Sequence, residues 1–147
     1  IDGALGTAEA RAIVPAVIEK IKGYAPEDVF ATRDTHGEDY LNTQEGHYLP
    51  VKHCIRGTDG WELDEEIAAL IPKDHIFDKG TFGSTELAAA VKELAARDIC
   101  VVSNALLLKA SLPEVKISVD PACCAGVTPE KHAAALETLR SCQVQCG

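Results

Sequence analysis

Residues Val115–Arg140, VKISVDPACCAGVTPEKHAAALETLR, place a strand pattern and a helix pattern on either side of a short polar turn. Val115 to Val119 alternates β-branched residues with polar ones, which is typical of a strand. Pro129 to Arg140 is amphipathic, and Pro129 suits the first turn of a helix. A strand that ends in a polar turn and continues into a helix is the building unit of an α/β protein.

The preceding part of the chain repeats this alternation of strands and helices. We expect further strands at Asp28–Arg33 and Asp74–Asp78. We expect helices at Thr7–Lys22, at Glu62–Leu70, from a cap at Ser84 to about Arg97, and at Val101–Lys109. Pro15 predicts a kink or a later start in the first helix. The alternation predicts a single three-layer α/β/α domain, residues 1–147, around a central, mostly parallel sheet.

Composition excludes several classes of protein. A net charge of -9 argues against nucleic acid or an anionic membrane as a partner, because either would require a basic face. No segment approaches the roughly 18 consecutive apolar residues of a membrane span. The six cysteines lack the spacing of a disulfide framework, so we expect reduced thiols in a cytoplasmic protein.

Candidate metal ligands follow the strand predicted at Asp28–Arg33. If the extended geometry continues, Asp34 and His36 lie on the same face of the strand. Glu45 and His53 could complete a divalent-metal site, and His47 is a competitor for the same role. The alternative is a solvated acidic loop, because a D-x-H pair is frequent by chance.

Lys79 and Cys100 are the candidate catalytic residues. Lys79 ends an apolar strand and precedes a glycine, which suits either a site or simple solvent exposure. Cys100 lies between Ile99 and Val101, where a buried and inert thiol is the usual state. A helix beginning at Cys100, with a nearby ammonium such as that of Lys79, would instead favour the thiolate.

Taken together, these segments resemble one known family. RDTH, LPVKHCIRGTDG, FDKGTFGS, DIC before a helix, and SVDPACCAGVTPEKHAAALETL occur in the order found in the isochorismatase-like cysteine hydrolases. The resemblance covers nearly the whole chain and is closest to the nicotinamidase/pyrazinamidase branch. It implies an α/β fold with a central parallel sheet and a Cys-Lys-Asp catalytic triad.

The resemblance also assigns roles to individual residues. Cys100 matches the nucleophile, and Lys79 matches the lysine of the triad. Asp34, His36 and His53 match the metal ligands of nicotinamidases, and Glu45 matches an acidic ligand of some members. The resemblance implies a bound divalent metal, zinc or alternatively iron or manganese. Members are commonly oligomeric, although nothing in the sequence defines an interface.

Two strands of the family pattern have no counterpart in this sequence. One is the first strand, which ends in the aspartate of the triad. The other separates the alanine-rich helix from Asp98-Ile99-Cys100, where about a dozen residues are absent. Ile1 is not an initiator methionine, and a sheet without two central strands would lose more than the ~5–15 kcal/mol that stabilises a domain. We therefore expect the native molecule to contain both strands.

The resemblance implies a cysteine amidohydrolase that converts a small amide such as nicotinamide into the acid and ammonia through a thioester, as in NAD salvage. An alternative is a family hydrolase for another substrate, such as an N-carbamoyl compound or an isochorismate-like enol ether. A further alternative is a truncated, non-catalytic metal-binding protein.

Overall fold

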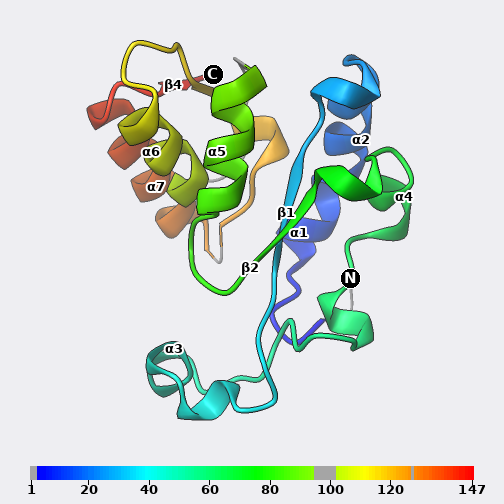
Figure 1. The fold of residues 1–147 in the computed structure, drawn as a ribbon. Helices are drawn as coiled ribbons and strands as arrows, with labels where there is room; N and C mark the ends of the chain where they lie inside the picture. Colours follow the sequence, from blue (N-terminus) through cyan, green and yellow to red (C-terminus); the bar gives the residue numbers. More distant parts are fainter. Residues whose placement is uncertain (1–2, 95–101, 127) are drawn as a thin grey trace.

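The computed structural model describes residues 3–94, 102–126 and 128–147, in which helices and parallel strands alternate (Figure 1). The strands are β1 (Ala31–Asp34), β2 (Ile76–Lys79), β3 (Ser118–Val119) and β4 (Gln145–Cys146). The helices are α1 (Ala8–Ala12), α2 (Val14–Lys22), α3 (Gln44–Tyr48), α4 (Glu65–Ala68), α5 (Thr85–Leu94), α6 (Val102–Ser111) and α7 (Pro129–Ser141). The α/β class predicted from the sequence is confirmed.

Every strand pair among the described residues is parallel. β1 pairs with β2 from Ala31 opposite Ile76 to Asp34 opposite Lys79, and β3 pairs with β4. The strands of the described part therefore form two parallel pairs rather than one continuous sheet. Helices α1 and α2 lie on one side of β1 and β2, and α5 to α7 lie on the other (Figure 1).

Local interactions explain where the elements differ from the predicted ranges. The predicted helix at Thr7–Lys22 is interrupted at Ile13, because Pro15 lies at the start of α2 and has no amide hydrogen to donate. The predicted helix at Glu62–Leu70 starts later, because the Asp64 carboxylate caps α4 by accepting from two backbone amides. β2 starts at Ile76 because His75 belongs to a short 3-10 turn and contacts Val29 and Phe30 instead.

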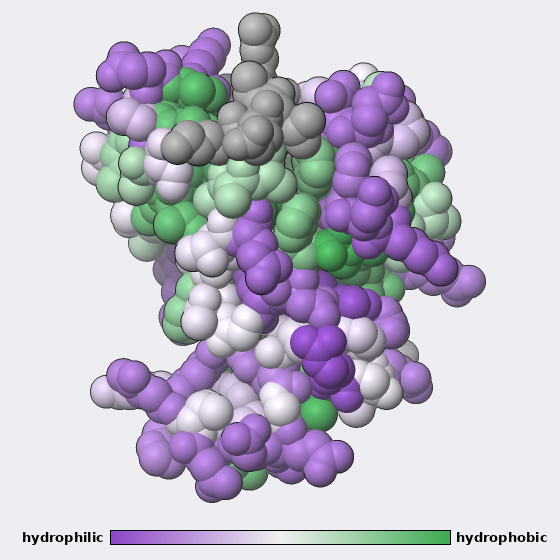
Figure 2. All heavy atoms as spheres, viewed as in Figure 1, coloured by the Kyte–Doolittle hydropathy of each residue, from purple (hydrophilic) through white to green (hydrophobic). Residues whose placement is uncertain are grey.

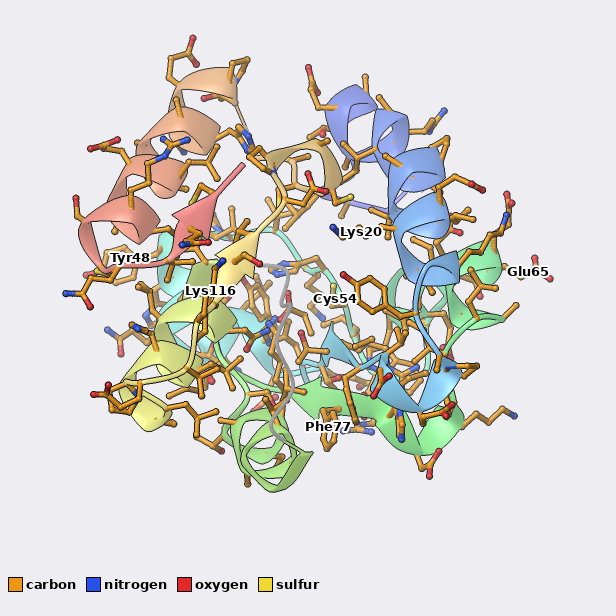
Figure 3. All side chains as sticks on the ribbon, turned by 90° about the horizontal axis from the view of Figure 1, so that it is seen from above. Lys20, Tyr48, Cys54, Glu65, Phe77 and Lys116 are labelled. Carbon is orange, nitrogen blue, oxygen red and sulfur yellow. The ribbon has the colours of Figure 1, made fainter. Side chains whose placement is uncertain are left out.

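The main apolar core lies between α5, α6, α7 and the β3–β4 pair. Its most buried members include Val91, Leu108, Ile117 and Leu139. Phe30 and Phe77 pack against the same cluster from the β1–β2 side, so one core supports both strand pairs. Viewed from above, Phe77 is seen on β2, and Lys20 extends inward from α2 (Figure 3). The Lys20 ammonium reaches the Asp120 carboxylate, with 3.4 Å between Nζ and Oδ2.

Residues 37–53, here called the arm, extend from the end of β1 and carry α3 (Figure 1). The face of the arm seen in Figure 2 is mostly hydrophilic. Its buried residues are Tyr40 and Gly46. None of the helices in the described part is long and apolar enough to cross a membrane.

Candidate active site

Asp34 and Lys79 lie together at the carboxyl ends of the paired strands β1 and β2. The parallel register places them opposite one another, as expected for polar residues that follow strands in an α/β fold. The Lys79 ammonium donates to the Asp34 carboxylate and, at 3.2 Å, to the Thr81 carbonyl oxygen. The Lys79 side chain is mostly buried, whereas that of Asp34 is half-exposed. The lysine is therefore held in place rather than extended into solvent.

The chain changes its strand partner immediately after Asp34. The Thr35 amide still donates to the Lys79 carbonyl oxygen at 2.9 Å, but the His36 amide donates to the Cys54 carbonyl oxygen at 2.9 Å. The Arg56 amide returns a bond to the His36 carbonyl oxygen at 3.0 Å, which forms a parallel bridge between His36 and Ile55. This bridge brings the His53 segment next to His36, although the two residues are far apart in sequence.

Helix α3 positions Glu45 beside the two histidines. Thr43 caps the helix, because its hydroxyl oxygen accepts from the Gly46 amide at 3.0 Å. A Cβ atom at Gly46 would overlap the Tyr40 carbonyl oxygen, so only glycine permits this close approach. Tyr40 is fully buried, and its ring contacts those of His36 and His53 with centroids 4.8 and 4.9 Å apart.

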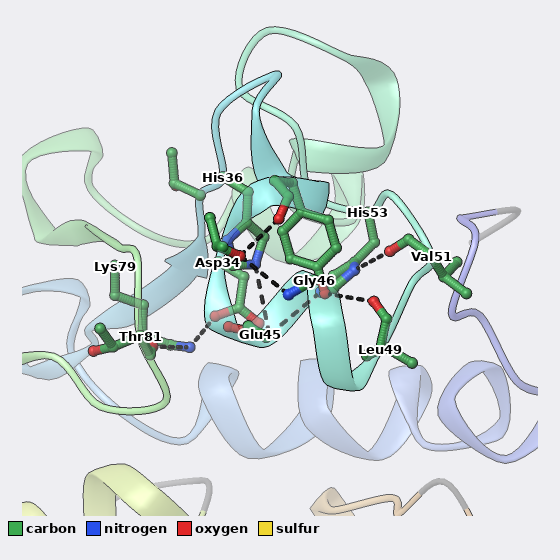
Figure 4. Close-up of polar contacts among 12 residues, drawn as sticks. Asp34, His36, Glu45, Gly46, Leu49, Val51, His53, Lys79 and Thr81 are labelled. Atoms are coloured by element: carbon green, nitrogen blue, oxygen red, sulfur yellow. Dashed lines mark hydrogen bonds and ion pairs between the residues drawn. The ribbon is translucent and has the colours of Figure 1, made fainter.

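His36, Glu45 and His53 converge on one point (Figure 4). Nε2 of each histidine lies 3.9 Å from Oε1 of Glu45, and the three candidate ligand atoms all lie within 4.8 Å of one another. Zinc bonds of about 2.0–2.2 Å place tetrahedral ligand atoms about 3.4 Å apart. Small movements of the side chains would therefore complete a metal site.

The protonation pattern of the histidines also fits a metal ion. Nδ1 of His53 lies 2.8 Å from the Val51 carbonyl oxygen, which can only accept, so Nδ1 is the donor and the neutral ring has its lone pair on Nε2. Ligating histidines commonly donate their second ring nitrogen in this way. Nε2 of His36 is buried and has no hydrogen-bond partner among the described residues. A buried polar atom of this kind is usually satisfied by water or an ion, so the three residues fit a divalent metal.

The structure thus brings together three of the four predicted metal ligands. Asp34 is not part of the group, because its carboxylate pairs with Lys79, and its role as a ligand stays a prediction. His47 is exposed in the last turn of α3 and lies outside the group. Cys100, the predicted nucleophile, lies outside the described residues.

Cys54 follows His53 directly and is the thiol closest in sequence to the metal group. Burial raises the pKa of this thiol, the Asp34 carboxylate raises it further, and the Lys79 ammonium offsets this only in part. Cys54 therefore remains a neutral thiol at neutral pH and is a poor nucleophile. Its positive φ of 47° shows that it belongs to the turn that leads from His53 into the bridge with His36.

Two residues connect the elements around the site: Asn104, for which the sequence favours a capping or packing role, and Trp61, which was not identified from the sequence. Asn104 on α6 is 2% exposed, accepts from the Ser84 amide and donates to the Thr32 hydroxyl, so it joins α6 to α5 and β1. Trp61 donates from Nε1 to the Thr35 hydroxyl at 2.8 Å. Trp61 is the single tryptophan and follows a Gly-containing turn, which was the only signal available.

Comparisons with known proteins identify the family. A family model for the isochorismatase domain matches residues 1–147. The chain belongs to the isochorismatase family. The comparison with curated protein sequences finds no significant match.

Solved structures similar to this family member include the pyrazinamidase of Pyrococcus horikoshii in complex with zinc, with a TM-score of 0.76 and 23% identity over 98% of this chain and 89% of that chain. The pyrazinamidase/nicotinamidase of Streptococcus mutans has a TM-score of 0.78 and 20% identity over 95% and 87% of the two chains. PnC1 of L. infantum in complex with nicotinate has a TM-score of 0.79 and 18% identity over 98% and 83%. At these identities the similarity establishes the fold.

Proposed function

We propose that this isochorismatase-family protein is a metal-dependent cysteine amidohydrolase of the nicotinamidase type, which converts a small aromatic amide into the acid and ammonia. Family membership supports a hydrolase. The observation that carries the narrower proposal is the convergence of His36, Glu45 and His53. Nδ1 of His53 faces the Val51 carbonyl oxygen, and Nε2 of His36 is buried with no hydrogen-bond partner in the described part of the chain.

The proposed reaction uses Cys100 as the nucleophile. The thiolate attacks the amide carbonyl carbon, the C–N bond breaks, and ammonia leaves with the proton from the thiol. Water then hydrolyses the thioester to the carboxylic acid and regenerates the thiol. Lys79 lowers the pKa of the thiol and balances the negative charge that develops, and its contacts with Asp34 and Thr81 hold its ammonium at the strand end.

The metal group would act on the substrate rather than on the nucleophile. A bound divalent ion supplies Lewis acidity that can orient a substrate through a ring nitrogen. Its ligands are two imidazoles and one carboxylate, which accept zinc, iron or manganese. Cys54, Cys142 and Cys146 are free thiols, in keeping with a cytoplasmic enzyme of NAD salvage.

The test is an ammonia-release assay with nicotinamide, together with the metal content of the purified protein. Cys100→Ala should lower kcat by about 10³-fold or more and leave metal content unchanged. Cys142→Ala is the matched control, because this exposed cysteine follows α7 and should not affect turnover. Full activity in Cys100→Ala would rule out the thioester mechanism.

A second candidate is a family hydrolase with another substrate, such as an N-carbamoyl compound. The metal group favours nicotinamidase activity over this second candidate, because the metal ligands implied by the family resemblance are those of nicotinamidases. Turnover of an N-carbamoyl amide without turnover of nicotinamide would support the second candidate. Metal binding with no hydrolysis of either substrate would support a non-catalytic metal-binding protein.

A further inference from the structure

A polar cluster around Trp61 lies next to the metal group. We define the Trp61 cluster as Arg33, Thr35, Arg56, Trp61 and Asp78. The Arg33 guanidinium lies 3.5 Å from the centre of the Trp61 ring, and that of Arg56 lies 5.5 Å from it. Both distances are within the range of a cation–π contact, and Trp is the ring that favours it most.

Asp78 connects the two arginines on the β2 side of the cluster. It accepts from Nε of Arg33 and from Nη1 of Arg56, each at 2.9 Å. Burial by itself would raise the pKa of Asp78, but the hydrogen bonds and charges of Arg33 and Arg56 outweigh it and hold that pKa below its usual value. The carboxylate is therefore charged at neutral pH, and both guanidinium groups are fixed relative to β2.

The cluster reaches the metal group through Thr35, which lies between Asp34 and His36. The Thr35 hydroxyl accepts from Nε1 of Trp61 at 2.8 Å and donates to the Arg33 carbonyl oxygen at 3.1 Å. On the other side, the Trp61 amide donates to Thr58, and the Thr58 amide donates to Ile55 within the bridge to His36. The segment after His53 is thus attached at both of its ends to Thr35 and His36, the two residues that directly follow β1.

We propose that Trp61 is a positioning residue that holds the segment following His53 against β1 and so sets the metal affinity of His36, Glu45 and His53. This inference rests on the metal centre of the proposed function. The backbone bridge at His36 and Ile55 constrains one end of the segment, and Trp61 constrains the other. Outer residues that orient metal ligands commonly change affinity by about 10–100-fold when they are removed.

Zinc dissociation constants of the purified full chain, measured by chelator competition well below Tm, test this inference. Trp61→Leu, which removes both the ring and the indole N–H, should weaken zinc binding about 10–100-fold. Trp61→Phe keeps an aromatic ring for Arg33 but loses the hydrogen bond to Thr35. This variant should weaken zinc binding about threefold to tenfold. Thr35→Val removes the hydroxyl that accepts from Trp61. The double variant with Trp61→Phe should therefore bind zinc almost as tightly as Trp61→Phe alone.

Phe30→Leu is the control for stability alone. Phe30 stacks on His75 and packs against the core. This variant should lower the Tm of the metal-free protein and leave zinc affinity unchanged. If Trp61→Leu behaves like Phe30→Leu, Trp61 has only a structural role and the inference is wrong. If the wild-type protein binds no zinc, the metal centre itself is wrong and the inference fails with it.

Discussion

At the scale of single residues, one backbone carbonyl determines which ring nitrogen of His53 is available to a metal ion. The Val51 carbonyl fixes the proton on Nδ1, so Nε2 presents a lone pair toward Glu45. His36 contributes a buried nitrogen to the same point. Glu45 then supplies the negative charge that two neutral imidazoles lack. Loss of its carboxylate should therefore weaken the binding of a divalent cation more than loss of either imidazole.

Glu45→Gln should weaken zinc binding at least about tenfold, because an amide oxygen carries no charge and is a weaker ligand than a carboxylate. His47→Ala is the matched control, since His47 is exposed on the same short helix and lies outside the group. Titration of the metal-free protein with zinc against a chromophoric chelator gives both affinities. Equal affinities for Glu45→Gln and the wild type would exclude Glu45 as a ligand.

Residue types and order predicted the convergence of His36, Glu45 and His53, because imidazole and carboxylate groups around an extended segment suit a metal. Sequence could not predict that Asp34 pairs with Lys79. That contact arises from the parallel register of β1 and β2, in which residues 45 positions apart become neighbours. The Trp61 cluster was missed for the same reason, since Arg33 and Asp78 are also opposite one another in that register.

At the scale of elements, Asn104 joins three segments that approach the site. It lies on α6, its amide oxygen accepts from the Ser84 amide before α5 at 3.0 Å, and its amide nitrogen donates to Thr32 of β1 at 3.1 Å. Ser84 is also buried and caps α5 by accepting from the Leu87 amide. One buried side chain therefore joins the start of α5, the first turn of α6 and the strand β1.

Asn104→Ala should lower the free energy of unfolding by about 2–3 kcal/mol, because the buried Ser84 amide and Thr32 hydroxyl both lose a partner. Ser111→Ala, an exposed change at the end of the same helix, should stay within about 0.5 kcal/mol of the wild type. Urea unfolding followed by circular dichroism measures both variants. A loss below about 0.5 kcal/mol for Asn104→Ala would show that this linkage contributes nothing to stability.

The elements themselves were predictable to different degrees. The helices α6 and α7 begin and end within two residues of the predicted ranges, and α7 was predicted from its amphipathic pattern. β4 was missed, because Gln145–Cys146 is too short to show a period and forms only by pairing with β3. The break between α1 and α2 was foreseen from Pro15, since the missing amide hydrogen is a property of that residue alone.

At the scale of the whole molecule, the site joins two regions of unequal packing. The α5–α6–α7 core contains most of the buried apolar residues, whereas the buried residues of the arm are Tyr40 and Gly46. Local opening needs the least free energy where few apolar contacts are lost. The arm carries Glu45 and His53, whereas His36 directly follows Thr35 at the end of β1 and forms backbone hydrogen bonds with Cys54 and Arg56. A bound ion would therefore link the weakly packed region to the strand.

Saturating zinc should slow amide hydrogen exchange in residues 40–53 much more than in α5 and α7, because the ion adds a link only between the arm and β1. At about 100 times its dissociation constant, the ion should stabilise the closed arm by about 2.7 kcal/mol, which is a roughly 100-fold slowing of exchange. Exchange measured by mass spectrometry with and without zinc gives the comparison, and Glu45→Gln should remove most of the difference. Equal slowing in the arm and in the core would mean that the arm opens only when the whole domain unfolds, so that the ion stabilises the fold globally.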